Sequence, residues 1–177
     1  MALTNKEKAA NKRKGMIEKA REYQIGTYSA EFTAKDFQKM IRAEAAALPA
    51  GPTPAIVDGE LIEVYRNVGQ CVCVSCGVVY PWNTKKMHAG HFLASRRASI
   101  LYEEDNVHPQ CNRCNTYDDG NPQAYRLWME LVYGKEVIER LRRLKNTTVT
   151  FSRDELVDMR IGYAARLKAA EEKMKTW

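Results

Sequence analysis

No segment of this 177-residue sequence approaches the run of about 20 apolar residues that a membrane-spanning helix requires. The first residues, MALTNKEKAANKRKG, also lack the apolar segment of a secretory signal. Internal repeats are absent, and low complexity is confined to this basic N-terminal segment. We therefore expect neither a membrane protein nor a secreted one. The remaining composition, with 45% apolar residues, is typical of a soluble globular protein.

Acidic residues are fewer than basic ones, with 22 Asp and Glu against 28 Lys and Arg and a net charge of +6. An excess of positive charge favours an anionic partner such as nucleic acid. Residues 5–22 predict a basic helix that is either a solvated surface helix or an arm along a phosphate backbone. Further candidate contacts to a DNA backbone are Arg140, Arg142, Arg143 and Lys145.

Three regions differ in their patterning. Residues 1–50 are basic and helical, with a second helix predicted over 33–48 and Thr33 as its N-cap. The prolines of residues 49–54 predict a linker. Residues 55–120 have the composition of short strands and loops. Residues 121–177 return to helix.

Three helices are predicted in the C-terminal region. The first covers 121–133, with Asn121 as cap and Pro122 at the first helical position. A short helix follows at 135–144. The last covers 153–175 and opens on a capping box from Ser152 to Glu155. Its length makes it a candidate surface for a homodimer.

The cysteines are not expected to form disulfide bonds, because the sequence has no export signal and the cytosol keeps thiols reduced. Four of the five cysteines form two C-x-x-C pairs, Cys73 with Cys76 and Cys111 with Cys114. Two such turns supply the tetrahedral thiolate set of a structural zinc site. A redox motif would need only one pair. The fifth, Cys71, is interpreted as a small buried hydrophobe.

The interval between the two pairs holds all three histidines, His88, His91 and His108. Asn106 lies 15 residues after His91, and Asn115 follows the last cysteine directly. With these spacings the sequence resembles the HNH nucleases. That resemblance implies a ββα-metal unit in which His91 is the general base, Asn106 holds the following loop, and Asn115 binds a catalytic divalent ion.

A more specific resemblance is to the phage recombination endonucleases of the NinG/Rap family, which cut branched DNA such as Holliday junctions. It rests on C-V-S-C-G at 73–77, A-G-H-F at 89–92, N-V-H-P-Q-C at 106–111, C-N at 114–115 and G-N-P-Q-A-Y-R at 120–126. The order of the parts is also similar to that in endonuclease VII, a phage junction resolvase. This resemblance implies an enzyme that acts in the cytoplasm of an infected bacterium.

The resemblance and the two C-x-x-C pairs together predict an α+β fold. Its centre is a small zinc-stapled, HNH-like ββα-metal unit, flanked by N- and C-terminal helices. The implied chemistry is phosphodiester hydrolysis with structural zinc and catalytic Mg²⁺ or Mn²⁺. Many HNH enzymes carry Asp or His directly before the general base, but this chain has Gly90 there. Either Asn115 holds the ion with waters and phosphate oxygens, or His88 supplies a further ligand.

Several residues have a functional and a structural interpretation. His108 is either catalytic or a packing residue. Arg96, Arg97 and Arg113 are either phosphate contacts or solvated arginines. Asp118 and Asp119 either bind metal or form a turn with Gly120. The aromatic residues of the first C-terminal helix, which are Tyr125, Trp128 and Tyr133, are expected in the core rather than stacked on bases.

The leading hypothesis is a metal-dependent endonuclease for branched DNA. One alternative is a zinc-stabilised nucleic-acid-binding module without catalysis, in which His91 only packs or contacts phosphate. The other is an HNH nuclease that cuts ordinary duplex or single-stranded DNA.

Overall fold

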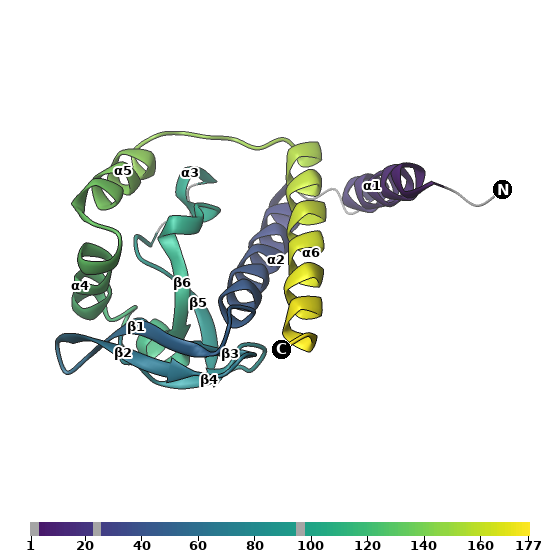
Figure 1. Ribbon diagram of the computed structural model, residues 1–177. Helices are drawn as coiled ribbons and strands as arrows, with labels where there is room; N and C mark the ends of the chain where they lie inside the picture. The colour runs from purple at the N-terminus through teal and green to yellow at the C-terminus, as the bar shows by residue number, and fades with distance from the viewer. Residues whose placement is uncertain (1–3, 23–25, 95–97) are drawn as a thin grey trace.

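The computed structural model describes residues 4–22, 26–94 and 98–177 and has a mixed α+β fold (Figure 1). The helices are α1 (Asn5–Glu22), α2 (Gly26–Ala46), α3 (Ala98–Leu101), α4 (Pro122–Val132), α5 (Lys135–Lys145) and α6 (Arg153–Lys175). Two short helical turns are η1 (Glu104–Asn106), which is 3₁₀, and η2 (Arg113–Tyr117), which is π-helical. The strands are β1 (Gly51–Val57), β2 (Glu60–Arg66), β3 (Gln70–Val72), β4 (Val79–Pro81), β5 (Met87–His91) and β6 (Val107–Cys111).

The strands form three small antiparallel sheets, β1–β2, β3–β4 and β5–β6. In the last of these, Gly90 pairs with His108 and His88 pairs with Gln110. Successive side chains on a strand point to opposite faces of the sheet. His88 and Gly90 therefore share one face of β5 with His108 and Gln110 of β6, whereas His91 lies on the other.

Helices α2 and α6 pack side by side along the edge of the molecule (Figure 1). Ion pairs reinforce the contact, between Arg160 and Asp36 and between Arg166 and Glu44. The predicted helix over 33–48 is wrong at its start, because α2 begins seven residues earlier and Thr33 is not an N-cap. Thr33 lies inside the helix, where its buried hydroxyl donates to the Leu156 carbonyl of α6, 3.3 Å away. This hydroxyl therefore joins α2 to α6 and does not cap a helix.

The predicted linker over 49–54 is also wrong, because strand β1 begins at Gly51 and contains both Pro52 and Pro54. Proline has no N–H to donate, which excludes it from a strand that is paired on both edges. β1 pairs only with β2 among the described residues, so one edge tolerates both prolines.

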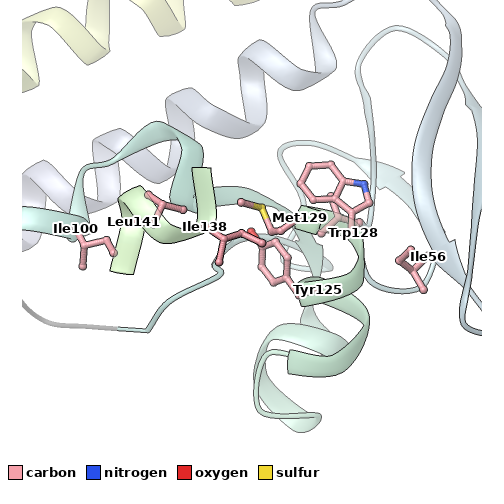
Figure 2. Close-up of a cluster of buried hydrophobic side chains, with 8 residues drawn as sticks. Ile56, Ile100, Tyr125, Trp128, Met129, Ile138 and Leu141 are labelled. Carbon is pink, nitrogen blue, oxygen red and sulfur yellow. The ribbon is translucent and has the colours of Figure 1, made fainter. Parts of the chain in front are cut away.

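The largest core cluster of the described residues joins α4 and α5 to β1 and α3, and Figure 2 draws its buried side chains, most of them labelled. Tyr125 and Trp128 are buried in it, and the Trp128 indole donates to the Pro54 carbonyl at 2.8 Å. Tyr133 packs against its margin. The expectation that these aromatic residues belong to the core is therefore confirmed.

A second apolar cluster packs the β5–β6 sheet against α2. Phe37 and Met40 of α2 are buried against Ala89 of β5 and Val107 of β6. Arg42 of α2 donates to the Met87 carbonyl at the start of β5, 2.6 Å away. Strand β5 is thereby fixed at one end by a hydrogen bond and along one face by packing.

The predicted C-terminal helices match α4, α5 and α6 closely, and the capping box at Ser152 and Glu155 is present. Asn121 does occupy the N-cap position of α4, but its side chain makes no capping bond. Its backbone is left-handed, with φ 44°, and its amide donates to the Ser75 carbonyl and the Cys114 sulfur instead. Within the described residues, no helix has the length and apolar character to cross a membrane.

Candidate functional site

The four cysteines of the two C-x-x-C pairs come together at the base of the β5–β6 sheet. Cys73 and Cys76 lie in the turn between β3 and β4, Cys111 ends β6, and Cys114 lies in η2. Their sulfur atoms all lie within 4.8 Å of one another. Gly77 completes the first turn with φ 72°, and a Cβ on it would lie 2.5 Å from Val57. The turn therefore requires glycine both for its conformation and for the close approach of β1.

The donor set and spacing fit a tetrahedral metal ion. Zn–S bonds of about 2.3 Å place tetrahedral sulfur atoms about 3.8 Å apart, and the Cys76 and Cys111 sulfurs are separated by 3.7 Å. Burial raises the pKa of Cys114 to about 12, so a dication is needed to hold such thiols as thiolates. The cluster could hold a metal such as zinc. No other group of three or more His, Cys, Asp or Glu in the described ranges is arranged to do so.

Cys71 stands outside this cluster. It lies in β3, is buried, and donates its thiol to the Arg42 carbonyl at 3.2 Å. Burial raises the pKa of the Cys71 thiol to about 12. Its interpretation as a small buried hydrophobe is confirmed.

Asn115 follows Cys114 in η2, and its side chain reaches back to β5. The amide nitrogen lies 3.0 Å from His88 Nδ1. Its oxygen faces the α-carbon of Gly90, because a Cβ on Gly90 would lie 3.0 Å from Asn115 Oδ1. The structure thus brings together Asn115, His88 and Gly90. No hydrogen bond joins Asn115 to His91 among the described residues.

Gln110 fills the space in which an acidic side chain at position 90 would lie. A Cβ on Gly90 would lie 2.2 Å from Gln110 Oε1. The Gln110 amide nitrogen is held by the Ser75 hydroxyl at 2.8 Å and the Gly120 carbonyl at 2.7 Å. Sequence analysis missed Gln110, because its contact with Gly90 depends on the strand register. The available signal was its position two residues after His108, which places both side chains on the same face of β6.

Gly90→Ala should therefore destabilise the protein by about 1–3 kcal/mol, as added methyl groups do in packed interiors. Gln110 cannot move aside without losing two buried hydrogen bonds. Chemical denaturation measures the effect, and Gly162→Ala in α6 is the control, since a Cβ there meets nothing within 4 Å. Wild-type stability in Gly90→Ala would show that Gln110 leaves room for a side chain at position 90.

His91 ends β5, half-buried, and its Nε2 lies 3.1 Å from the Leu101 carbonyl. A carbonyl oxygen only accepts, so Nε2 carries the hydrogen and Nδ1 keeps its lone pair. Burial lowers the pKa of His91, although the Leu101 carbonyl partly opposes the shift. His91 is therefore a neutral imidazole with a basic nitrogen, and no partner for that nitrogen is found in the described part of the chain.

Asn106 holds the segment between β5 and β6 and is fully buried. Its Oδ1 accepts from the Leu93 backbone N–H at 2.8 Å, and its Nδ2 donates to the Leu93 and Ile100 carbonyls. This is the loop-holding geometry that the HNH resemblance implies. The same segment carries Leu101, so Asn106 also fixes the carbonyl that orients His91.

His108 lies on β6 and is buried against Trp128. Tyr125 donates its hydroxyl hydrogen to the Gly90 carbonyl, so it must accept from His108 Nδ1 at 2.9 Å. Nε2 of His108 then accepts from the Tyr133 hydroxyl at 3.0 Å. Both ring nitrogens are committed inside the core, which supports the packing interpretation.

Burial lowers the pKa of His108 to about 3, and this makes folding sensitive to acid. Below the ordinary histidine pKa of about 6.5, the unfolded chain binds a proton that the folded chain excludes. Stability is therefore lost as pH falls from about 6.5 toward 3, with about 2 kcal/mol of the loss reached at pH 5. Urea denaturation across this range, compared with a His108→Phe variant, measures the effect. An equal acid dependence in both proteins would assign the loss to other groups.

Residues 59–173 match the family model described as the bacteriophage lambda NinG protein. The match covers more than half of the chain and contains the four-thiol cluster and the His88–Asn115 region. The chain belongs to the NinG family. The resemblance to that family is thereby confirmed, whereas the likeness to HNH nucleases and endonuclease VII stays a prediction.

Individual NinG proteins align over shorter stretches. The protein of Escherichia phage 933W is 31% identical over 75 residues, which are 42% of this chain and 36% of the relative. The phage lambda protein is also 31% identical over 75 residues, covering 35% of its length. The Salmonella phage P22 protein is 34% identical over 58 residues, 32% of this chain and 27% of the relative. The matched part spans about a third of these relatives, and no solved structure gives a significant match.

The remaining candidates in the NinG-family region are less defined. Arg113 is exposed and lies 3.6 Å from Asp118. Asp119 and Gly120 form a left-handed turn, so the turn interpretation of the Asp pair is supported. Arg140 is engaged by Glu103 and Asp105, which leaves it poorly placed for a DNA backbone. Arg96 and Arg97 lie outside the described residues.

Proposed function

We propose that this NinG-family chain is a metal-dependent DNA endonuclease, with β5, β6 and η2 as an HNH-like ββα unit. The observation that carries the proposal is the state of His91, whose Nε2 is bound to the Leu101 carbonyl while Nδ1 has no hydrogen-bond partner among the described residues and can accept a proton. A general base needs that arrangement, and a positioned imidazole typically contributes about 10²–10⁴-fold to a rate.

His91 takes the proton of the water that attacks the scissile phosphate. Its lowered pKa keeps the imidazole neutral at pH 7, and the bond of Nε2 to the Leu101 carbonyl leaves Nδ1 as the nitrogen that takes the proton. The imidazolium that forms is stabilised by the same carbonyl. Asn106 keeps this carbonyl in place by holding both Leu93 and Ile100.

Asn115 supplies a carboxamide oxygen for a divalent cation. The residues fit Mg²⁺ or Mn²⁺, because these ions are held by few protein oxygens and keep several waters. Such a cation would polarise the phosphate and stabilise the leaving 3′-oxygen. Because Cys114 precedes Asn115, a metal in the four-thiol cluster would fix the turn that carries this oxygen.

His91 and Asn115 lie on opposite faces of β5 and so approach a substrate from two sides. β5 pairs only with β6 in the described ranges, which leaves its other edge without a strand. We propose that the phosphodiester binds along that edge. This placement would give the base and the cation access to the same phosphate.

DNA binding would come mainly from phosphate contacts by basic residues. Arg142 and Arg143 are exposed in the last turn of α5, and α1 carries the basic N-terminal segment. We propose branched DNA as the substrate, a homodimer as the active form, and the cytoplasm of the infected bacterium as the place of action. These proposals are for the whole protein and derive from the family resemblance.

Cleavage of matched substrates tests this function. A four-way junction, a flap and a linear duplex of the same sequence are incubated with zinc-loaded protein and Mg²⁺ or Mn²⁺. We expect the junction to be cut in preference to the other two. Equal cutting of all three would support an ordinary HNH nuclease, and binding without cutting under either ion would favour the non-catalytic zinc module.

A further inference from the structure

We propose that His88 is a positioning residue that turns the carboxamide oxygen of Asn115, and not its nitrogen, toward Gly90. This inference rests on the proposed function, in which that oxygen holds a divalent cation. It also decides between the two ways of holding the ion that the sequence left open, because it excludes His88 as a ligand.

The hydrogen bonds of His88 fix its tautomer. Nε2 lies 3.2 Å from the Lys85 carbonyl, which can only accept, so Nε2 carries the hydrogen. Nδ1 then has a lone pair and no hydrogen. Asn115 must place its Nδ2 donor there, 3.0 Å away, and the other branch of the amide is necessarily the oxygen. His88 has no further lone pair with which to bind a cation.

Gln110 supplies a competing acceptor close to Asn115, because both side chains approach Gly90. Gln110 Oε1 is buried and has no hydrogen-bond partner among the described residues. It flanks the same Gly90 position as Asn115 Oδ1, at 2.2 and 3.0 Å from a Cβ placed there. Without the lone pair of His88, Asn115 can turn its nitrogen toward Gln110. The amide would then present N–H groups to the cation.

The orientation matters because a divalent cation is bound by the oxygen of an amide and repelled by its N–H groups. Residues that orient a metal ligand typically change affinity by about 10–100-fold when they are removed. We expect the same here, with no change at the four-thiol cluster. Asparagine at position 88 offers an oxygen close to the place of Nδ1, and it should restore the orientation.

The test compares Mn²⁺ binding by zinc-loaded wild type, His88→Leu, His88→Ala and His88→Asn, measured by electron paramagnetic resonance. Leucine and alanine should weaken Mn²⁺ binding about tenfold or more, whereas asparagine should stay within about threefold of wild type. Zinc content and thermal unfolding show which variants are folded. Electron spin-echo envelope modulation of bound Mn²⁺ detects a coordinated imidazole nitrogen. We expect no nitrogen coupling that is present in wild type and lost in the His88 variants.

Three results would overturn the inference. Asn115-dependent Mn²⁺ binding that stays at wild-type strength in folded His88→Leu and His88→Ala would remove the positioning role alone. A nitrogen coupling that is lost in every His88 variant would make His88 a ligand. Mn²⁺ binding that is equal in wild type and Asn115→Ala would remove the proposed cation site, and this inference with it.

Discussion

Replacing His91 by alanine is expected to reduce DNA cleavage by about 10²–10⁴-fold, the usual contribution of a positioned general base. DNA binding and zinc content should not change, because His91 ends a strand whose packing depends on Ala89 and Val107. Initial rates on a labelled four-way junction, with binding measured in the absence of divalent ions, give both quantities. Added imidazole should partly restore cleavage in the alanine variant, which a purely structural role would not explain.

The acid limb of the pH–rate profile tests the same residue. Burial lowers the pKa of His91, so the proton that blocks the base is taken up below the ordinary value of about 6.5. We expect cleavage to decline only below that pH and the decline to vanish in the residual activity of His91→Ala. Full activity in His91→Ala would assign the reaction to another base.

Removing the metal from the four-thiol cluster is expected to unfold the region from β3 to η2. Structural zinc contributes about 10–16 kcal/mol to folding in small zinc-bound units, which is comparable to the whole stability of a typical domain, about 5–15 kcal/mol. Cys114→Ser or a strong chelator should therefore abolish cooperative thermal unfolding and, with it, cleavage. Circular dichroism and elemental analysis measure the two effects together.

Cys71→Ala provides the matched control, because Cys71 is buried in β3 but lies outside the cluster. It loses one hydrogen bond, to the Arg42 carbonyl, and should cost about 1 kcal/mol. Zinc content should stay at that of wild type. If Cys71→Ala and Cys114→Ser destabilise the protein equally, the cluster has no special role in folding.

Signals that depend on neighbouring residues could be predicted from the sequence. The C-x-x-C turns and the capping box of α6 each depend on a few adjacent positions, and the structure has all of them. The meeting of the two C-x-x-C pairs, which are far apart in sequence, could be predicted because zinc prefers four ligands. The loop-holding role of Asn106 was implied by the resemblance to HNH nucleases, and its side chain does bind Leu93 and Ile100.

Features that depend on distant contacts could not be predicted. The sequence placed Thr33 at a helix start. Its hydroxyl instead binds the Leu156 carbonyl of a helix that is far away in sequence, and this contact leaves no local signal. Pro52 and Pro54 indicated a break, but β1 accepts them because it pairs with a strand on only one edge in the part of the chain that the structure describes. The close contact of Gln110 with Gly90 follows from the register of β5 on β6, in which Gly90 pairs with His108 and His88 pairs with Gln110, and the side chain of Gln110 leaves no room for an acidic side chain at position 90.

Anomalous diffraction from crystals of His91→Ala, bound to a four-way junction with Mn²⁺, tests the central claim most directly. We expect zinc among the four sulfurs and manganese next to Asn115 Oδ1, with a junction phosphate between that oxygen and position 91. Manganese bound away from Asn115, or no metal among the sulfurs, would contradict the account.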